Sequence, residues 1–209
     1  MVEIRRLAPD RGGQAPLLGL GMFIGEVARI LGHMAKSDSF FIRIKATTNG
    51  ATYVQEEGDL GSFVNLGVKS STLLRIHNIQ AQIADDGGPE LPISGVAGAS
   101  TRIAWQLTTQ SQTAMVYADD KSLISSGGVT MYPGETGSGT FNTANSVEDF
   151  DINPQQWRNG YLVGVDSIFL GVDASGTPAS GEAVVSLVLE CTLESATQAS
   201  ATALALSQQ

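Results

Sequence analysis

The sequence is poor in the residues that build disulfides, metal sites and nucleophilic catalytic centres. It has one cysteine, Cys191, and two histidines, His33 and His77, which lie far apart in the chain. A single cysteine cannot form a disulfide within the chain, so the fold is not a disulfide-stapled scaffold. A zinc site or a histidine-activated nucleophile needs more partners than these residues supply. We therefore expect Cys191 to be a buried, inert thiol and His77 to be a structural residue.

Charged and aromatic residues are scarce as well. Charged residues make up 16% of the chain, whereas soluble domains typically contain ~25%. Aromatic residues make up 6%, with only two tryptophans, Trp105 and Trp157. A glycosidase needs two carboxylates at a fixed separation, and such sites usually lie among aromatic rings, of which this chain has few. A surface of small neutral polar groups is typical of proteins that pack against copies of themselves, although secreted β-proteins share it.

The few charges are unevenly distributed along the chain. Residues 1–45 carry a net charge of +3 and residues 46–209 a net charge of −12. Binding to nucleic acid depends on lysine and arginine neutralising phosphates, so we expect no specific nucleic-acid binding by the acidic body. The basic first part could face a lipid headgroup layer or the acidic patch of a neighbour. The simpler alternative is a set of scattered, solvated charges.

Adjacent carboxylates occur at Asp85-Asp86, at Asp119-Asp120, and at Glu148-Asp149 with Asp151. Calcium requires six to eight oxygen ligands, and none of these groups has the spacing of an EF-hand loop. A solvated turn explains each of them more simply. The glycine-rich stretch 134–139 lacks the Gly-Lys-Ser/Thr ending of a phosphate-binding loop. The sequence therefore predicts no catalytic residue, no metal ligand and no cofactor.

Both ends of the chain differ in character from its middle. Residues 1–38 are predicted to form an extended arm and a helix, because apolar residues recur at helical spacing from Leu17 to Met34. Residues 195–209 form a low-complexity tail of small and polar residues. Such a tail cannot bury much surface on its own, so we expect it to be mobile or docked on a neighbouring subunit.

The central region, residues 39–194, reads as a β domain. In residues 183–193 apolar side chains alternate strictly with others, which indicates a strand with one buried face. We expect this strand to form an antiparallel pair with residues 161–172. Further strands are predicted at 40–48, at 51–55 pairing back on it, and at 63–68, 72–84, 102–110 and 123–124. Residues 56–61 are expected to form a loop, and residues 127–140 a loop with at most one short strand. Residues 152–157 are expected to include one helical turn.

No helix of 10–15 residues separates these strands, so the fold class is all-β. We predict a single jelly-roll or β-sandwich barrel of about eight antiparallel strands, with an N-terminal helix and flexible termini.

Three stretches of this pattern resemble a known family. They are Thr72-Leu-Leu-Arg-Ile-His-Asn-Ile-Gln-Ala-Gln-Ile83, residues 103–115, and Arg158-Asn-Gly-Tyr-Leu-Val-Gly-Val-Asp-Ser-Ile-Phe169. With the closing strand, they resemble the single jelly-roll (vertical β-barrel) major capsid proteins of membrane-containing icosahedral viruses of archaea and bacteria. The resemblance covers residues 40–194 in pattern. It implies a homo-oligomer that shares a virion shell with other capsid proteins, with the N-terminal region against an inner membrane.

The leading hypothesis is therefore a structural capsid protein without enzymatic activity. It would assemble into the capsomers of an icosahedral shell. A β-sandwich binding or adhesion module for a carbohydrate or surface ligand is the alternative, and it would need an aromatic platform or a calcium site. A jelly-roll enzyme would need a convergent carboxylate or histidine cluster.

Overall fold

A computed structural model describes residues 38–67, 70–89, 100–135, 141–148, 152–176 and 181–209 of this protein. The chain divides into two compact units, Met1–Lys36 and Ser37–Gln209, and every described strand and helix belongs to the second. The helix predicted within residues 1–38 lies outside the described residues. Among the helices that the structure describes, none is both long and apolar enough to span a membrane.

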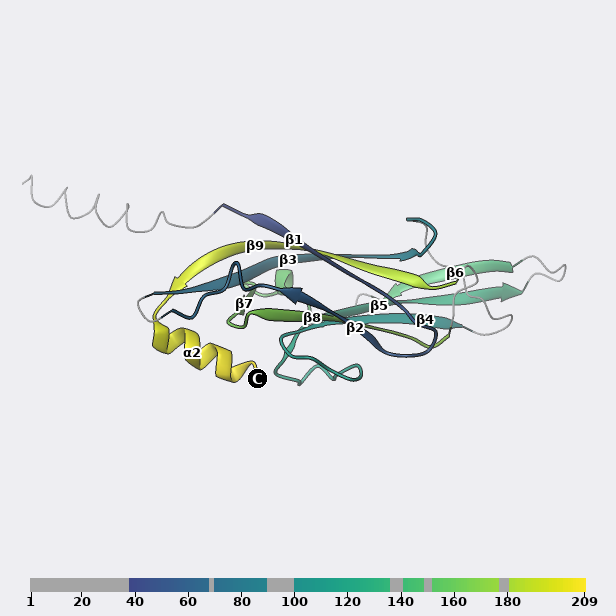
Figure 1. The fold of residues 1–209 in the computed structure, drawn as a ribbon. Coiled ribbons are helices and arrows are strands. Elements are labelled where there is room, and N and C mark those ends of the chain that lie inside the picture. Colours follow the sequence, from purple (N-terminus) through teal and green to yellow (C-terminus); the bar gives the residue numbers. More distant parts are fainter. Residues whose placement is uncertain (1–37, 68–69, 90–99, 136–140, 149–151, 177–180) are drawn as a thin grey trace, which may run out of the picture. The chain divides into compact units, whose positions relative to one another are not determined.

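Nine strands form two antiparallel sheets (Figure 1). The first sheet has the order β1 (Phe40–Thr47), β9 (Ala183–Ala196), β3 (Ser71–Asp85) and β7 (Tyr161–Val163). The second has the order β2 (Val54–Asp59), β8 (Ser167–Ala174), β4 (Thr101–Thr108), β5 (Leu123–Glu135) and β6 (Phe141–Glu148). A 3-10 turn, η1 (Pro154–Gln156), and a helix, α2 (Gln198–Ser207), complete the described elements.

The strand pairing follows a simple rule. The first strand pairs with the last, β2 with β8, β3 with β7, and β4 with β5. A long two-stranded ribbon wrapped into two facing sheets produces this order, and it is the eight-stranded jelly-roll arrangement of two Greek keys. Strand β6 adds a ninth strand at the edge of the second sheet beside β5. The predicted all-β jelly roll is therefore confirmed.

The core lies between the two sheets. On β9 the predicted alternation is confirmed, because Ala183, Val185, Leu187, Leu189 and Cys191 are all 0% exposed. They pack in one apolar cluster with inward residues of the second sheet such as Ile103, Leu107, Leu170 and Val172. Burying one such side chain stabilises the fold by about 1.5–3 kcal/mol relative to leaving it in water.

The predicted pairing of residues 161–172 with 183–194 was wrong. The first segment is split between β7 in the first sheet and β8 in the second, while β9 pairs with β1 and β3. The turn-forming residues between β8 and β9 connect two sheets rather than two hairpin arms. A loop composition shows that the chain reverses, but it does not show in which sheet the next strand lies.

Three other predictions failed around β2. Residues 51–55 do not pair back on β1; the strand starts at Val54 and pairs with β8 in the other sheet. The predicted loop 56–61 lies largely within that strand. The described part of 63–68 forms a turn with one isolated bridge, Asn65 to Thr72, instead of a strand.

The predicted loop 127–140 was wrong at its start, because β5 continues to Glu135. Gly127 lies opposite Trp105, and a Cβ on this glycine would lie 2.9 Å from the indole ring. This glycine therefore makes room for a large buried side chain in a strand, instead of marking a turn.

The tail at 195–209 was expected to be mobile or docked on a neighbouring subunit, but its residues 198–207 are helical and pack on this domain. They form α2, with Thr197 as N-cap, whose hydroxyl accepts from the Ser200 N–H. Ala201 and Ala205 are buried, so their small side chains let the helix approach the domain closely. The last turn is fixed by Gln208, whose Nε2 donates to Leu162 O at 2.7 Å and whose Oε1 accepts from Gly164 N at 2.9 Å.

The Gln208 amide should therefore hold α2 on the domain. We expect Gln208→Ala to lower the free energy of unfolding by about 1–3 kcal/mol, because it leaves a buried N–H and C=O without partners. Urea denaturation followed by far-UV circular dichroism measures this change. Gln209→Ala, at the neighbouring exposed position, is the matched control. Equal stability of the two variants would contradict the anchoring role.

Candidate functional site

The outer face of the second sheet is covered by residues 109–122, the connection from β4 to β5, which we call the covering loop. Its main tether is Gln106 on β4, a side chain with 0% exposure. Gln106 Oε1 accepts from Val116 N at 2.7 Å, and its Nε2 donates to Ala114 O at 3.0 Å. Both polar ends of this buried amide are thus hydrogen-bonded, and both of these bonds reach the covering loop.

A second tether involves β2 and the residue before it. Gln106 Nε2 also donates to the Tyr53 hydroxyl at 2.9 Å, and Gln55 Oε1 accepts from Gln112 N at 2.7 Å. Tyr53 lies across Gly171 of β8, where a Cβ would be 2.0 Å from the phenol oxygen. Burial raises the pKa of Tyr53, which keeps the phenol neutral and able to donate. It donates to Gln55 Oε1 at 3.3 Å.

The two ends of the covering loop are fixed separately. At its start, Thr109 Oγ1 donates to Gln208 O at 2.8 Å, which connects the loop to α2. Near its end, Asp120 Oδ1 accepts from the hydroxyl and the N–H of Ser122 at 2.6 and 2.8 Å. These two donors hold the pKa of Asp120 below its ordinary value.

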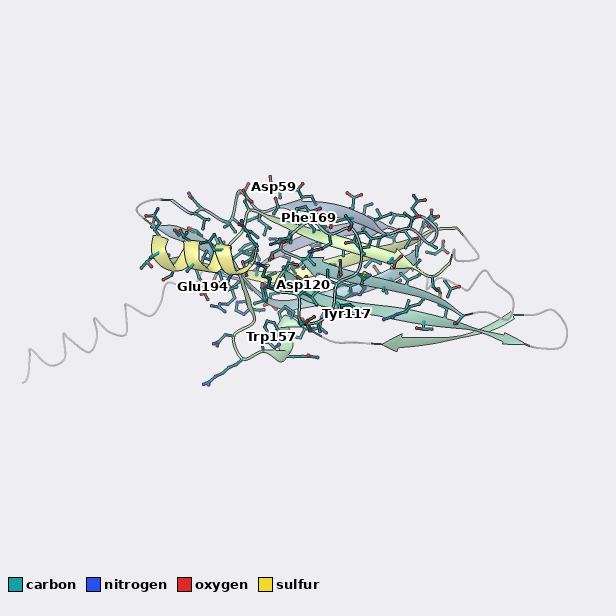
Figure 2. All side chains as sticks on the ribbon, turned by 90° about the horizontal axis from the view of Figure 1, so that it is seen from below. Asp59, Tyr117, Asp120, Trp157, Phe169 and Glu194 are labelled. Atoms are coloured by element: carbon teal, nitrogen blue, oxygen red, sulfur yellow. The ribbon has the colours of Figure 1, made fainter. Side chains whose placement is uncertain are left out.

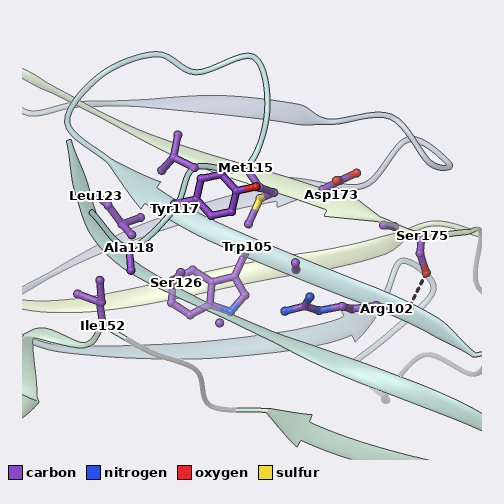
Figure 3. A pocket seen from close by; sticks show the side chains of 14 residues that line it. Arg102, Trp105, Met115, Tyr117, Ala118, Leu123, Ser126, Ile152, Asp173 and Ser175 are labelled. Carbon is purple, nitrogen blue, oxygen red and sulfur yellow. Dashed lines mark hydrogen bonds between the residues drawn. The ribbon is translucent and has the colours of Figure 1, made fainter. Parts of the chain in front are cut away.

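Between the covering loop and the sheet lies a hollow of about 720 Å³ (Figure 3), which we call the loop hollow. Figure 3 shows Tyr117 and Met115 beside each other. The main-chain N–H of Arg102 donates to Ser175 Oγ at 2.8 Å, and a dashed line marks this bond in Figure 3. Tyr117 is 86% exposed, and Figure 2 shows it on the same loop as Asp120. The lining combines apolar side chains with a few polar ones, as ligand sites commonly do. It comprises Arg102, Ala104, Trp105, Met115, Val116, Tyr117, Ala118, Leu123, Ser126, Gly127, Ile152, Asp173, Ala174 and Ser175.

The residues considered from the sequence do not converge on this hollow. His77 Nε2 lies 2.9 Å from Thr192 Oγ1, so it joins β3 to β9 in the other sheet. Asp85 is the last residue of β3 and Asp86 begins the turn after it, where Asp85 Oδ1 accepts from Gly87 N. The side chains of Glu148, Asp149 and Asp151 lie outside what the structure describes. No group of three or more histidine, cysteine or acidic side chains in the described residues could hold a metal ion.

Of the sequence candidates whose side chains the structure describes, only Trp105 borders the loop hollow, and it is 4% exposed, so it offers no open platform for a sugar ring. Trp157 is 44% exposed beside Tyr161, with ring centroids 5.7 Å apart, on a different part of the surface. Sequence reasoning missed Tyr53, Gln106 and Tyr117. The one available signal was Gln106 itself, a polar residue between the apolar Trp105 and Leu107 in a predicted strand.

Cys191 is the buried thiol that the sequence predicted. Burial, aided by the charge of Glu190, raises its pKa to about 12. The thiolate is the reactive form, and the raised pKa keeps the Cys191 thiol protonated at neutral pH.

No family model matches this sequence, and no curated protein matches it. Among solved structures, VP1 of Human Polyomavirus 12 in complex with 3'-sialyllactosamine has a TM-score of 0.38 and 9% identity, covering 76% of this chain and 100% of that one. VP1 of Trichodysplasia spinulosa-associated polyomavirus has a TM-score of 0.34 and 9% identity, covering 75% and 96%. A structure of Desmodium yellow mottle tymovirus has a TM-score of 0.32 and 9% identity, covering 91% of this chain and 94% of that one. At this level of similarity the alignments carry no argument about this chain.

The tethering role of Gln106 predicts a local effect. Gln106→Leu keeps the volume but leaves Val116 N and Ala114 O without their partner, so the covering loop should detach. We expect trypsin to cleave after the exposed Lys121 about 5- to 150-fold faster in native protein, since loop opening would cost about 1–3 kcal/mol less. Gln80→Leu, at an exposed position on β3, is the control. An unchanged cleavage rate would show that the loop is held by other contacts.

The raised pKa of Cys191 predicts a pH dependence of stability. The folded state binds the thiol proton more tightly than the unfolded state, so this contribution is complete below pH 9 and is lost as the pH rises toward 12. Between pH 8 and pH 10 the natural chain should lose about 1.4 kcal/mol more stability than Cys191→Ala. Urea denaturation of both proteins at the two pH values measures the difference. Parallel pH profiles would contradict the assignment.

Proposed function

We propose that this protein is a structural capsid protein that self-assembles into the capsomers of an icosahedral virion shell. The observation that carries the proposal is the strand pairing, in which β1 pairs with β9 and each inner strand with its counterpart in the wrapped ribbon. Jelly rolls of this kind recur in viral capsids, and also in lectins and cupins. This strand order supports the resemblance of the sequence to the single jelly-roll capsid proteins.

The composition supports the shell over the other jelly-roll functions. Only 16% of the residues are charged, and a surface with little charge suits a subunit that is covered on many sides by neighbours. The partners we propose are further copies of the chain and other capsid proteins. We also propose that the basic N-terminal region contacts an inner membrane, and that the acidic body binds no nucleic acid specifically.

The loop hollow favours a second candidate, a binding or adhesion module for a carbohydrate or surface ligand. Tyr117 is almost fully exposed at the rim, and an exposed aromatic ring beside arginine, aspartate and serine can contact a sugar. This candidate requires no self-assembly, which separates it from the first.

The decisive measurement is the mass of the full chain in solution, by size-exclusion chromatography with multi-angle light scattering and negative-stain imaging of the same fractions. We expect rings, capsomers or closed shells, and smaller species after deletion of residues 1–16, because this segment would contact neighbours. A single 21.8 kDa species at high concentration, unchanged by the deletion, would overturn the capsid proposal. It would favour the binding module.

A further inference from the structure

Strands β1 and β2 lie together at one edge of the sandwich, which we call the charged edge. Strand β1 pairs only with β9, and β2 only with β8, so among the described residues each is the outermost strand of its sheet. The two strands approach closely, since a Cβ on Gly58 would lie 3.1 Å from Ile44 Cδ1. Both present unpaired main-chain N–H and C=O groups on the same side of the domain, and such groups can bind another chain.

The charges on these two strands are fully separated by sign. Strand β1 carries the exposed Arg43 and Lys45 and no acidic residue. Strand β2 carries the exposed Glu56, Glu57 and Asp59 and no basic residue.

None of these five side chains forms an ion pair within the part of the chain that the structure describes; Glu57 accepts a hydrogen bond from Ser167 and Asp59 one from Gly61. The reason lies in the alternation of the strands. Arg43 lies opposite Val188 and Lys45 opposite Ser186, so both belong to the outer face of the first sheet. Glu57 and Asp59 flank Gly58, which faces Ile44 and Ile168, so they belong to the outer face of the second sheet. Glu56 alternates with them and shares the face of Gly58, so Glu57 and Asp59 are the two carboxylates of β2 on that outer face.

This separation selects one way for two copies to meet. Contact of β1 with β1 would bring four cations together, and contact of β2 with β2 would bring six carboxylates together. Contact of β1 with β2 of the other copy places opposite charges side by side. A two-fold axis parallel to the strands makes that contact twice, because it brings each β1 beside the other copy's β2.

We propose that the charged edge is a self-complementary docking surface for the charged edge of a second copy of this chain. This contact would be one of the subunit contacts of the proposed capsid shell, so it rests on the proposed function. An exposed ion pair contributes about 0–1 kcal/mol, so the charges mainly select the partner strand. The unpaired main-chain groups and Phe41, which is 55% exposed on β1, supply further contact.

The test uses two reversal variants of the full chain, Arg43→Glu with Lys45→Glu, and Glu57→Lys with Asp59→Lys. Each variant alone makes both contacts repulsive, so we expect self-association, measured by sedimentation velocity across a concentration series, to weaken at least about tenfold. A mixture of the two variants restores opposite charges across both contacts, so we expect it to associate as the natural chain does.

Matched controls change the net charge equally at exposed positions away from the charged edge. They are Lys121→Glu with Arg158→Glu, and Asp86→Lys with Asp119→Lys. We expect both controls to associate like the natural chain. Circular dichroism melting of every variant shows that a loss of association is not a loss of fold.

The outcomes separate this inference from the proposed function. If the natural chain assembles and the reversal variants assemble equally well, the charged edge is not the contact, while the capsid proposal stands. If the variants fail and their mixture also fails, the opposite-charge pairing is wrong. If the natural chain stays monomeric at every concentration, both proposals are overturned.

Discussion

The pairing of the first strand with the last is the constraint on which the rest of the domain depends. Strand β9 pairs along its length with β1 on one side and β3 on the other, so the sheet cannot close until residues far apart in the sequence have met. Forming such contacts requires a large loss of chain entropy before any burial repays it. The alternating apolar face of β9, with five residues at 0% exposure, provides the burial that offsets this entropy loss at the centre of the first sheet.

The same constraint explains why sequence reasoning succeeded within strands and failed between them. The alternation in residues 183–193, the long strand at β3 and the helical turn at η1 are local patterns, and all three are confirmed. The partners of β2, β7 and β8 depend on the wrapping of the whole ribbon, which no local pattern encodes. The expected hairpins assumed that neighbours in sequence are neighbours in a sheet, and a jelly roll breaks that assumption at most of its connections.

The errors at Gly127 and at α2 have a different origin. Glycine usually indicates a turn, but Gly127 is set by the indole of Trp105 across the strand pair, a contact between positions 22 residues apart. A segment of alanine, serine and threonine usually indicates a tail, but here small side chains allow α2 to pack closely while Gln208 supplies the polar anchors. The candidate site was missed for the same reason, because Gln106 and Tyr53 gain their meaning only from the covering loop that they hold.

The charges on the edge strands β1 and β2 are arranged differently from those of an edge that is merely protected from pairing. An edge strand that must stay unpaired is usually protected by charges of either sign, which repel or solvate any approaching strand. On β1 and β2 the charges are sorted by strand, cations on one and carboxylates on the other. Simple protection would not require sorting, since mixed charges or a single sign on both strands would block association equally well. Sorting disfavours contact between like strands and favours contact between unlike strands, which is the property that a subunit needs if it is to meet its own copies in one defined geometry.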